Sequence, residues 1–214
     1  MNDIQAYKAY PHLRYWYNKL WLSEQLGYDC GPASLSPTRS AWYIVRPIMN
    51  LSGMGVGAKK TWIEAGDATK VPLGYFWCEW FEGHQYSVTY EWKDYWWNAI
   101  SSWMGVKDDK NLTKFHRWER CDYLPEIDVI FHDLARVGKI NVEFIGKHPI
   151  EVHLRTSPDP DYDILIPIWI GEEYLVDKYE KMGYTYIHSY DNADGFLDRA
   201  RLGFVVKIKE NENE

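Results

Sequence analysis

The chain has 214 residues, 46% of them hydrophobic and 26% charged, which is typical of a soluble globular protein with one domain or two small lobes. Its formal net charge of −7 argues against broad binding to a nucleic-acid backbone, and no stretch has the roughly 18 apolar residues of a membrane span. Its widely spaced cysteines form neither a zinc ligand pair nor an even set of disulfides. We therefore expect a cytoplasmic protein that binds neither nucleic acid nor membranes.

The first third of the chain predicts one helix and one hairpin. Apolar residues recur at helical spacing within residues 10–27, which indicates an amphipathic helix. Residues 27–40 are rich in glycine, proline and serine, and indicate a linker. Residues 41–50 and 59–65 are apolar strands on either side of a glycine-rich turn, so we predict a hairpin that carries a glycine flap.

The remaining elements mix strands with short helices. We expect a pair of strands in residues 73–83 and 84–92, whereas residues 93–105 suit a strand or a short helix equally. Apolar residues spaced by three and four predict a helix over residues 124–138. Two short strands with a turn between them follow in residues 140–155. The tail predicts an α plus β arrangement with strands at 164–170, 184–190 and 202–208.

The glycine flap is the first segment that suggests chemistry. Glycines at 53, 55 and 57 allow positive φ and a close approach of the backbone to a ligand, and successive amide N–H groups can cradle a phosphate. Arg46, one strand earlier, would add a cation. The pattern is neither a Walker loop nor a dinucleotide fingerprint, so by itself it is explained equally well by a structural hairpin.

Two acids, Glu79 and Glu82, end the next apolar strand, just before Gly83. A carboxylate at the rim of an apolar cleft suits a ribose hydroxyl, and the strand backbone beside it suits an adenine edge. Solvated acids at a strand end are the simpler explanation of this segment alone.

Acids also lie within the strands of residues 140–155. Because side chains alternate along a strand, the second of these strands has a polar face and a core face. The polar face holds Glu151, His153 and Arg155, and the core face holds Ile150, Val152 and Leu154. If the two strands pair, Glu143 lies beside Glu151, and two close carboxylates require a shared cation such as Mg²⁺. Salt bridges on a surface strand, such as Glu151 with Arg155, are the alternative.

Taken in order, the glycine flap after a Val-Arg-Pro strand, the acidic strand end, the helix and the paired acidic strands resemble the ATP-grasp superfamily of carboxylate–amine ligases. The resemblance spans residues 41–156. It implies an α+β, two-lobed fold with antiparallel sheets and a nucleotide site for ATP and Mg²⁺ between the lobes. The expected parts are an N-terminal helix and linker (1–40), a small lobe with the flap (41–90) and a larger lobe with the acidic strands and the tail (91–214).

The resemblance also assigns roles to residues. The catalytic cations fall on Arg46 and Arg155, and the metal ligands on Glu143, Glu151 and His153. The nucleotide contacts fall on Arg46, Gly53, Met54, Gly55, Gly57, Glu79, Trp80, Phe81 and Glu82, and on Arg117 from the basic segment 110–120. Arg46 stands where the superfamily usually has lysine, and His153 where it usually has asparagine.

The resemblance implies a ligase that phosphorylates a small-molecule or peptide carboxylate with ATP, so that an amine attacks the acyl phosphate. We expect a compact member without the usual N-terminal domain. Either residues 92–104 and the tail bind the substrate, or a second subunit, in a homodimer or with another partner, completes the site. The alternatives are a nucleotide-binding or interaction module without turnover, and an aromatic-rich sugar- or peptide-binding protein, suggested by 12 Trp and 17 Tyr.

Overall fold

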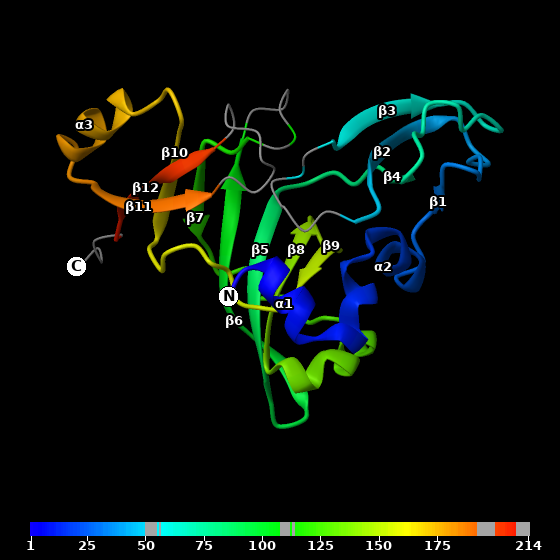
Figure 1. Cartoon of the computed structure of the whole chain (residues 1–214), viewed down its shortest axis with the longest axis horizontal. Coiled ribbons are helices and arrows are strands. Elements are labelled where there is room, and N and C mark those ends of the chain that lie inside the picture. Colours follow the sequence, from blue (N-terminus) through cyan, green and yellow to red (C-terminus); the bar gives the residue numbers. More distant parts are fainter. Residues whose placement is uncertain (50–54, 56, 108–111, 113, 192–199, 209–214) are drawn as a thin grey trace.

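The computed structural model describes residues 1–49, 55, 57–107, 112, 114–191 and 200–208. These residues form a four-stranded and an eight-stranded antiparallel sheet with short helices, so the fold is α+β, as predicted. In Figure 1 the four-stranded sheet lies at one end of the long axis and strands β10 to β12 at the other, with β5, β6, β8 and β9 between them.

The smaller sheet contains the predicted hairpin. Its strands are β1 (Cys30–Pro32), β2 (Ala41–Pro47), β3 (Lys59–Ile63) and β4 (Tyr75–Glu79), in the spatial order β1-β4-β2-β3. β2 pairs with β3 from Ala41 opposite Ile63 to Val45 opposite Lys59, which confirms the hairpin on either side of the glycine flap. β1 was not expected, because it lies in the glycine- and proline-rich segment 27–40, where it is held by pairing with β4.

The larger sheet contains the remaining strands. They are β5 (Gln85–Lys93), β6 (Trp96–Val106), β7 (Arg117–Arg120), β8 (Lys139–Ile145), β9 (His148–His153), β10 (Ile164–Trp169), β11 (Thr185–Asp191) and β12 (Arg201–Lys207). Their spatial order is β11-β12-β10-β7-β6-β5-β8-β9. The chain therefore passes from the smaller sheet to the larger one between β4 and β5. The smaller sheet differs from the expected 41–90 lobe at both ends, because it includes β1, which precedes residue 41, and excludes β5, which begins at Gln85.

Both strands expected in residues 73–83 and 84–92 are present, as β4 and β5. They do not pair with each other, because β4 pairs with β1 and β2 while β5 pairs with β6 and β8. The ambiguous segment 93–105 is a strand. It forms a hairpin with β5 through Asp94 and Tyr95, whose φ values of 55° and 63° suit a tight two-residue turn.

The helices are short. They are α1 (Asp3–Ala9), η1 (Pro11–Tyr17), α2 (Lys19–Gln25), η2 (Val129–Val137) and α3 (Tyr174–Glu180), η denoting 3₁₀. Of these, α1, α2 and η2 begin at side-chain caps, which are Asn2, Asn18 and Asp128. The single helix expected over 10–27 is interrupted at Asn18, whose side chain accepts a hydrogen bond from the Trp21 amide and starts a new helix. The helix expected over 124–138 begins only at Val129, after the Asp128 cap, and is 3₁₀. No helix in the described ranges has the length and hydropathy needed to cross a membrane.

The main core lies between four of the helices, α1, η1, α2 and η2, and one face of the larger sheet. The fully buried side chains there include Trp16, Leu22, Tyr90, Phe131, Leu134, Ile140, Phe144 and Leu154. Burying one such side chain contributes about 1.5–3 kcal/mol. Alternation along β8 sends Ile140, Val142 and Phe144 into this core, so Asn141 and Glu143 point to the opposite face. That opposite face is where the polar residues gather.

Candidate functional site

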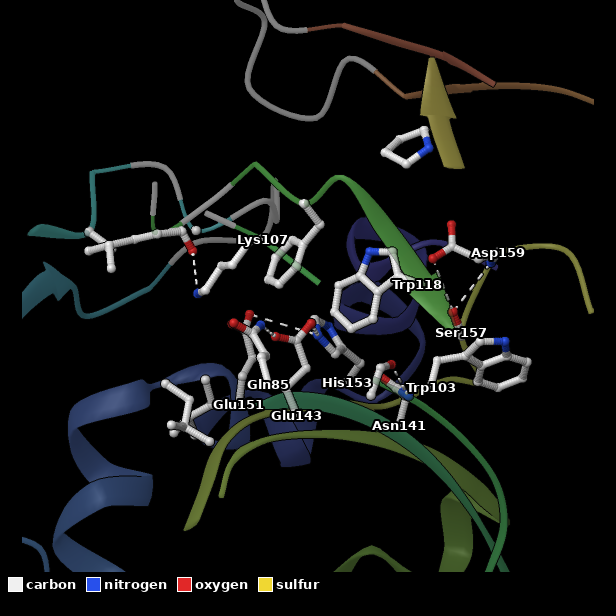
Figure 2. Close-up of a pocket in the computed structure, with 18 of the residues that line it drawn as sticks. Gln85, Trp103, Lys107, Trp118, Asn141, Glu143, Glu151, His153, Ser157 and Asp159 are labelled. Atoms are coloured by element: carbon white, nitrogen blue, oxygen red, sulfur yellow. Dashed lines mark hydrogen bonds and ion pairs between the residues drawn. The ribbon is translucent and has the colours of Figure 1, made fainter. Parts of the chain in front are cut away.

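A cavity of about 250 Å³ has walls from both sheets. Residues of β2 and β4 line it from the smaller sheet, and residues of β5 to β12 line it from the larger sheet. Figure 2 shows the acids of β8 and β9 on its floor and the tryptophans of β6 and β7 beside them. The described cavity thus joins segments that the sequence separates by more than half the chain.

The two predicted acids meet at the floor of the cavity. β8 and β9 pair in antiparallel register with Glu143 opposite Glu151, so the predicted pairing is confirmed. Both side chains line the cavity and are largely buried, with 25% and 14% of their surface exposed. Two carboxylates so close in a buried place need compensating charge.

A β-bulge follows this acid pair. Glu143 lies opposite Glu151 but Phe144 lies opposite Pro149, so Ile150 is an extra residue in β9. Ile150 was expected on the core face with Val152 and instead lines the cavity. Its carbonyl oxygen accepts a hydrogen bond of 3.0 Å from Nη2 of Arg46, which ties the smaller sheet to the larger one. Alternation alone could not predict this, because a bulge breaks the alternation.

The cations that compensate the acids come from β9 itself and from the N-terminal helices. Lys19 Nζ lies 3.0 Å from Glu151 Oε2. His153 Nε2 lies 3.5 Å from Glu143 Oε1 and 3.9 Å from Glu151 Oε1. Gln85 Nε2 donates a hydrogen bond of 2.8 Å to Glu143 Oε2. Because Asn18 caps α2, its first residue, Lys19, is placed where its side chain reaches β9.

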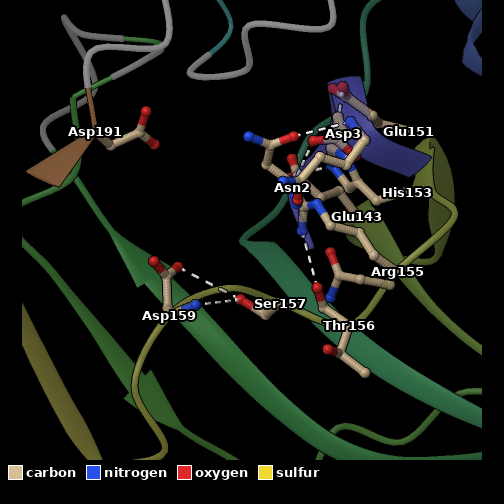
Figure 3. Close-up of polar contacts among 12 residues, drawn as sticks. Asn2, Asp3, Glu143, Glu151, His153, Arg155, Thr156, Ser157, Asp159 and Asp191 are labelled. Carbon is tan, nitrogen blue, oxygen red and sulfur yellow. Dashed lines mark hydrogen bonds and ion pairs between the residues drawn. The ribbon is translucent and has the colours of Figure 1, made fainter. Parts of the chain in front are cut away.

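A third acid lies behind His153. Asp3 Oδ1 is 3.1 Å from His153 Nδ1, and Asp3 Oδ2 forms an ion pair with Arg155 (Figure 3). Asp3 is the first residue of α1, which Asn2 and Gln5 close with reciprocal side-chain hydrogen bonds. Three acids and three cations therefore form one buried network that joins α1, α2, β8 and β9.

The network shifts the pKa values of its members. Burial alone would lower the pKa of His153, but the carboxylates of Asp3, Glu143 and Glu151 outweigh it and raise the pKa to about 10. Burial opposes ionisation of Asp3, yet His153 and Arg155 lower its pKa to about 2. The imidazole is therefore a cation at neutral pH, with both ring N–H groups directed at carboxylates.

The predicted metal site does not fit this arrangement. Among the described residues no group of three or more His, Cys, Asp or Glu is placed to hold a metal ion. Glu143 and Glu151 face each other, but His153 and Lys19 already neutralise them at 3.5 Å and 3.0 Å. A divalent cation would have to displace the His153 proton and move Lys19 away, because like charges repel strongly in a buried site.

Two other cations line the cavity without a carboxylate partner in the part of the chain that the structure describes. Arg46 is 9% exposed, its Nε makes no hydrogen bond with a described residue, and its guanidinium lies 5.2 Å from the centre of the Phe76 ring. Lys107 Nζ donates to the Leu112 carbonyl at 3.1 Å and lies 5.0 Å from the centre of the Phe115 ring. Burial lowers the pKa of Lys107, and the Glu143 carboxylate opposes that shift. Such cations favour an anionic ligand.

The predicted hinge residues divide between cavity and surface. Glu79, Trp80 and Phe81 line the cavity, and a Glu79 carboxylate oxygen accepts a hydrogen bond of 3.0 Å from the Asp29 amide. Glu82 does not line the cavity; it is exposed and accepts a 2.6 Å hydrogen bond from Trp80 Nε1. The ribose role assigned to Glu82 therefore has no support from its position.

The other predicted site residues divide between the cavity wall and positions outside it. Gly55 lines the cavity, and Arg155 lines it with an Nε that makes no hydrogen bond among described residues. Gly57 packs outside it, where an added Cβ would lie 2.7 Å from the Tyr75 hydroxyl. Arg117 is half exposed, pairs with Glu119 on its own strand and does not line the cavity. Gly53 and Met54 lie outside the described residues.

Several site residues were missed from the sequence. They are Asp3, Lys19, Gln85, Lys107, Asn141, Asp159 and Arg201. For Asn141 the signal was present, since it lies two residues before Glu143 and shares its face of β8. Lys19 and Asp3 gave no local signal, because each reaches the site through the packing of a separate helix.

No protein-family model matches the sequence, and no curated protein matches it. The chain is similar to the L-amino acid ligase from Bacillus licheniformis, with 12% identity and a TM-score of 0.45, over 66% of this chain and 41% of that one. It is also similar to N5-carboxyaminoimidazole synthase from Aspergillus clavatus in complex with ADP and 5-aminoimidazole ribonucleotide, with 9% identity and a TM-score of 0.45, over 87% and 59%. A third structure is the ATP-grasp ligase PsnB complexed with minimal precursor, with 13% identity and a TM-score of 0.34, over 68% and 53%.

PsnB and a further match, a putative ATP-grasp superfamily protein from Archaeoglobus fulgidus with 16% identity and a TM-score of 0.39, are described as ATP-grasp proteins. The chain spans 41% to 59% of the length of these three structures. At 9% to 13% identity and TM-scores of 0.34 to 0.45, these likenesses assign no activity to this chain.

Proposed function

We propose that the chain binds ATP in the cavity between its two sheets and is a ligase that activates a carboxylate as an acyl phosphate for attack by an amine. The observation that carries this proposal is that Arg46 from the smaller sheet and Lys107 from the larger one face one cavity without carboxylate partners among the described residues. A polyphosphate would place negative charge beside the buried Arg46 and the half-buried Lys107.

The rest of the cavity divides into parts suited to different parts of a nucleotide. Ile44, Cys78 and Phe81 form an apolar wall beside the segment between β4 and β5, which suits a base. Phe81 is itself fixed by stacking on the His148 ring, with centroids 4.1 Å apart. The phosphates would then extend toward Arg46, Lys107 and the flap residue Gly55.

In the proposed reaction the side chains position the substrates and neutralise charge, and none of them acts as a nucleophile. A carboxylate oxygen of the substrate attacks the γ-phosphorus of ATP, and the bond to the leaving ADP oxygen breaks. The amine nitrogen then attacks the acyl carbon, the carbon–oxygen bond breaks, phosphate leaves and the amine gives up a proton. Arg46, Lys107 and Arg155 would hold and neutralise the transferring phosphoryl group, which is the main contribution that proteins make to phosphoryl transfer.

Magnesium at Glu143, Glu151 and His153 remains a prediction that the present side-chain arrangement does not support. A bound Mg²⁺ would screen phosphate charge. Nucleotide affinity measured with Mg²⁺ and with EDTA shows whether Mg²⁺ contributes to nucleotide binding. If the ion binds at this pair, Glu151→Gln removes the effect of Mg²⁺ and the exposed control Glu126→Gln does not.

The proposal is tested in two stages. ATP at about 100 times its dissociation constant should add about 2.7 kcal/mol to the free energy of unfolding, read as a rise in melting temperature. ADP formation with panels of carboxylates and amines then tests turnover. No thermal shift with ATP would refute nucleotide binding, and no ADP with a broad panel would refute the ligase.

A second function, a nucleotide-binding or interaction module without turnover, is favoured by one observation. His153 and Lys19 already neutralise Glu143 and Glu151, so these acids do not require a metal ion to compensate their charge. ATP binding without ADP formation across the panels would support this module over the ligase.

A further inference from the structure

The end of the cavity away from the paired acids is built by the C-terminal strands. Ser157 and Asp159 precede β10, Asp191 ends β11, and Arg201 begins β12. Figure 3 shows Ser157, Asp159 and Asp191 grouped apart from Glu143 and its network, and Figure 2 shows Asp159 on the other side of Trp118 from Lys107. The cavity therefore has a second polar end.

Among the described residues, the charges of Asp159, Asp191 and Arg201 do not balance. Arg201 Nη2 lies 3.1 Å from Asp159 Oδ1 and 3.7 Å from Asp191 Oδ2, so two carboxylates share one guanidinium. Arg201 is 13% exposed, whereas Asp159 and Asp191 are 28% and 35% exposed, so both acids are more exposed than the cation between them. Burial raises the pKa of Asp159. When both acids are ionised, these three side chains carry a net charge of about −1, whereas the network at the other end is neutral.

Asp159 has hydrogen-bonding capacity to spare. Its Oδ1 atom is buried and lies in the 3.1 Å ion pair with Arg201, but makes no well-aligned hydrogen bond with a described residue. Among the described residues its Oδ2 has a single long contact, of 3.5 Å, from the Ser157 hydroxyl. The adjacent Asp161 and Asp163 differ, since both pair with Arg120. Buried carboxylate oxygens usually accept hydrogen bonds, so Asp159, which has an ion pair but only one long hydrogen bond among the described residues, can accept a further donor from a ligand.

The walls beside Asp159 are aromatic. Trp103 and Trp118 line the cavity together with Phe204, and the indole N–H of Trp103 is already bonded to the Tyr162 carbonyl at 2.9 Å. Arg120 and Arg201 already lie 4.6 Å and 4.2 Å from the centres of the Trp103 and Phe204 rings, so among the described residues Trp118 is the wall ring without a cation over it. Ring faces attract cations and exclude water, which strengthens a charge interaction made next to them.

We infer that this end of the cavity binds the primary ammonium group of the amine substrate, held by Asp159 and Asp191 against the tryptophan wall. A carboxylate substrate would face two acids here and be repelled, so the carboxylate belongs nearer Arg155 and Lys107. The identification of this ligand as the amine substrate of a ligase rests on the proposed function. The binding of an ammonium group at this end of the cavity is independent of that function.

The test compares three ligands that share a ring and differ in charge: benzylamine, benzyl alcohol and benzoate. At neutral pH the wild-type chain should bind benzylamine at least about tenfold more tightly than benzyl alcohol, and benzoate more weakly still, by NMR titration. Asp159→Asn and Asp191→Asn should each remove most of that preference. Asp161→Asn, two residues from Asp159 and 82% exposed, is the control and should keep it.

Two results would overturn the inference: benzoate binding as tightly as benzylamine, or an unchanged preference in both variants when circular dichroism shows them folded. The ADP affinity of the same proteins separates this inference from the proposed function. If ADP fails to bind while benzylamine binding depends on Asp159, the nucleotide proposal falls and the ammonium site stands. If ADP binds and benzylamine shows no preference, the ammonium site falls and the nucleotide proposal stands.

Discussion

At the scale of single residues, the main feature is a buried network in which every charge has a partner. Asp3, Glu143 and Glu151 face Lys19, His153 and Arg155, all within side chains that are at most 25% exposed. Removing one member of a buried ion pair typically costs about 3–5 kcal/mol, because the other charge is left without a partner. This network therefore fixes α1 and α2 against β9 and sets the floor of the cavity.

The network predicts a loss of stability at alkaline pH. The folded pKa of His153 is about 10, against an ordinary value of 6.5. Below pH 6.5 both folded and unfolded chains bind the proton and its stabilising contribution is complete. Between pH 6.5 and 10 only the folded chain holds the proton, so the free energy of unfolding falls by a few kcal/mol as pH rises. Urea unfolding measured across this range checks the prediction.

A variant of Asp3 tests whether the network causes this dependence of stability on pH. Asp3→Asn removes a carboxylate that raises the pKa of His153, so the alkaline loss of stability should become smaller. The acid side should change too, because the folded pKa of Asp3 is about 2 and its contribution is lost as pH falls from 3.8 toward that value. Asp94→Asn, in the exposed β5–β6 turn, is the control. The same alkaline slope in Asp3→Asn and wild type would contradict the role given to this network.

At the scale of elements, the alternation of side chains explains what the sequence could predict. The pairing of β8 with β9 and the meeting of Glu143 and Glu151 followed from local pattern, as did the β2–β3 hairpin. The face of β9 on which Ile150 lies could not be predicted from alternation, because a bulge in the pairing with β8 turns this residue toward the cavity. Glu82, to which the resemblance assigned a nucleotide contact, is exposed, in agreement with the simpler explanation of a solvated acid at a strand end.

The C-terminal strands, which build the second polar end, depend on one glycine. A Cβ added to Gly203 in β12 would lie 2.2 Å from the Ile187 carbonyl oxygen and 2.9 Å from the Tyr186 hydroxyl. Gly203→Ala should therefore separate β11 from β12 and cost about 3 kcal/mol. Faster hydrogen exchange of the β11 and β12 amides would show where the strands open.

Gly138→Ala is the control for that variant. Gly138 has a φ of 80° but no atom within 4 Å of its added Cβ, so only backbone strain of about 1 kcal/mol is expected. If Gly203→Ala costs no more than Gly138→Ala in urea unfolding, the close approach of β11 to β12 does not constrain this position.

At the scale of the whole molecule, the site exists because two sheets and two N-terminal helices converge on it. Lys19 meets Glu151, and Asp3 meets His153, across most of the length of the chain. Such contacts carry no local signal in a single sequence, since their positions depend on how separate elements pack. The division of the strands between the sheets was missed for the same reason: β4 and β5 are neighbours in sequence and belong to different sheets.

The central claim is that the cavity between the sheets binds a nucleotide through Arg46 and Lys107. Isothermal titration with ADP tests it most directly. We predict that ADP binds the wild-type chain, that Arg46→Met and Lys107→Met each weaken binding by about tenfold or more, and that Arg117→Met, outside the cavity, leaves it unchanged. Absence of ADP binding in the wild-type chain, or equal affinities in all three variants, would contradict it.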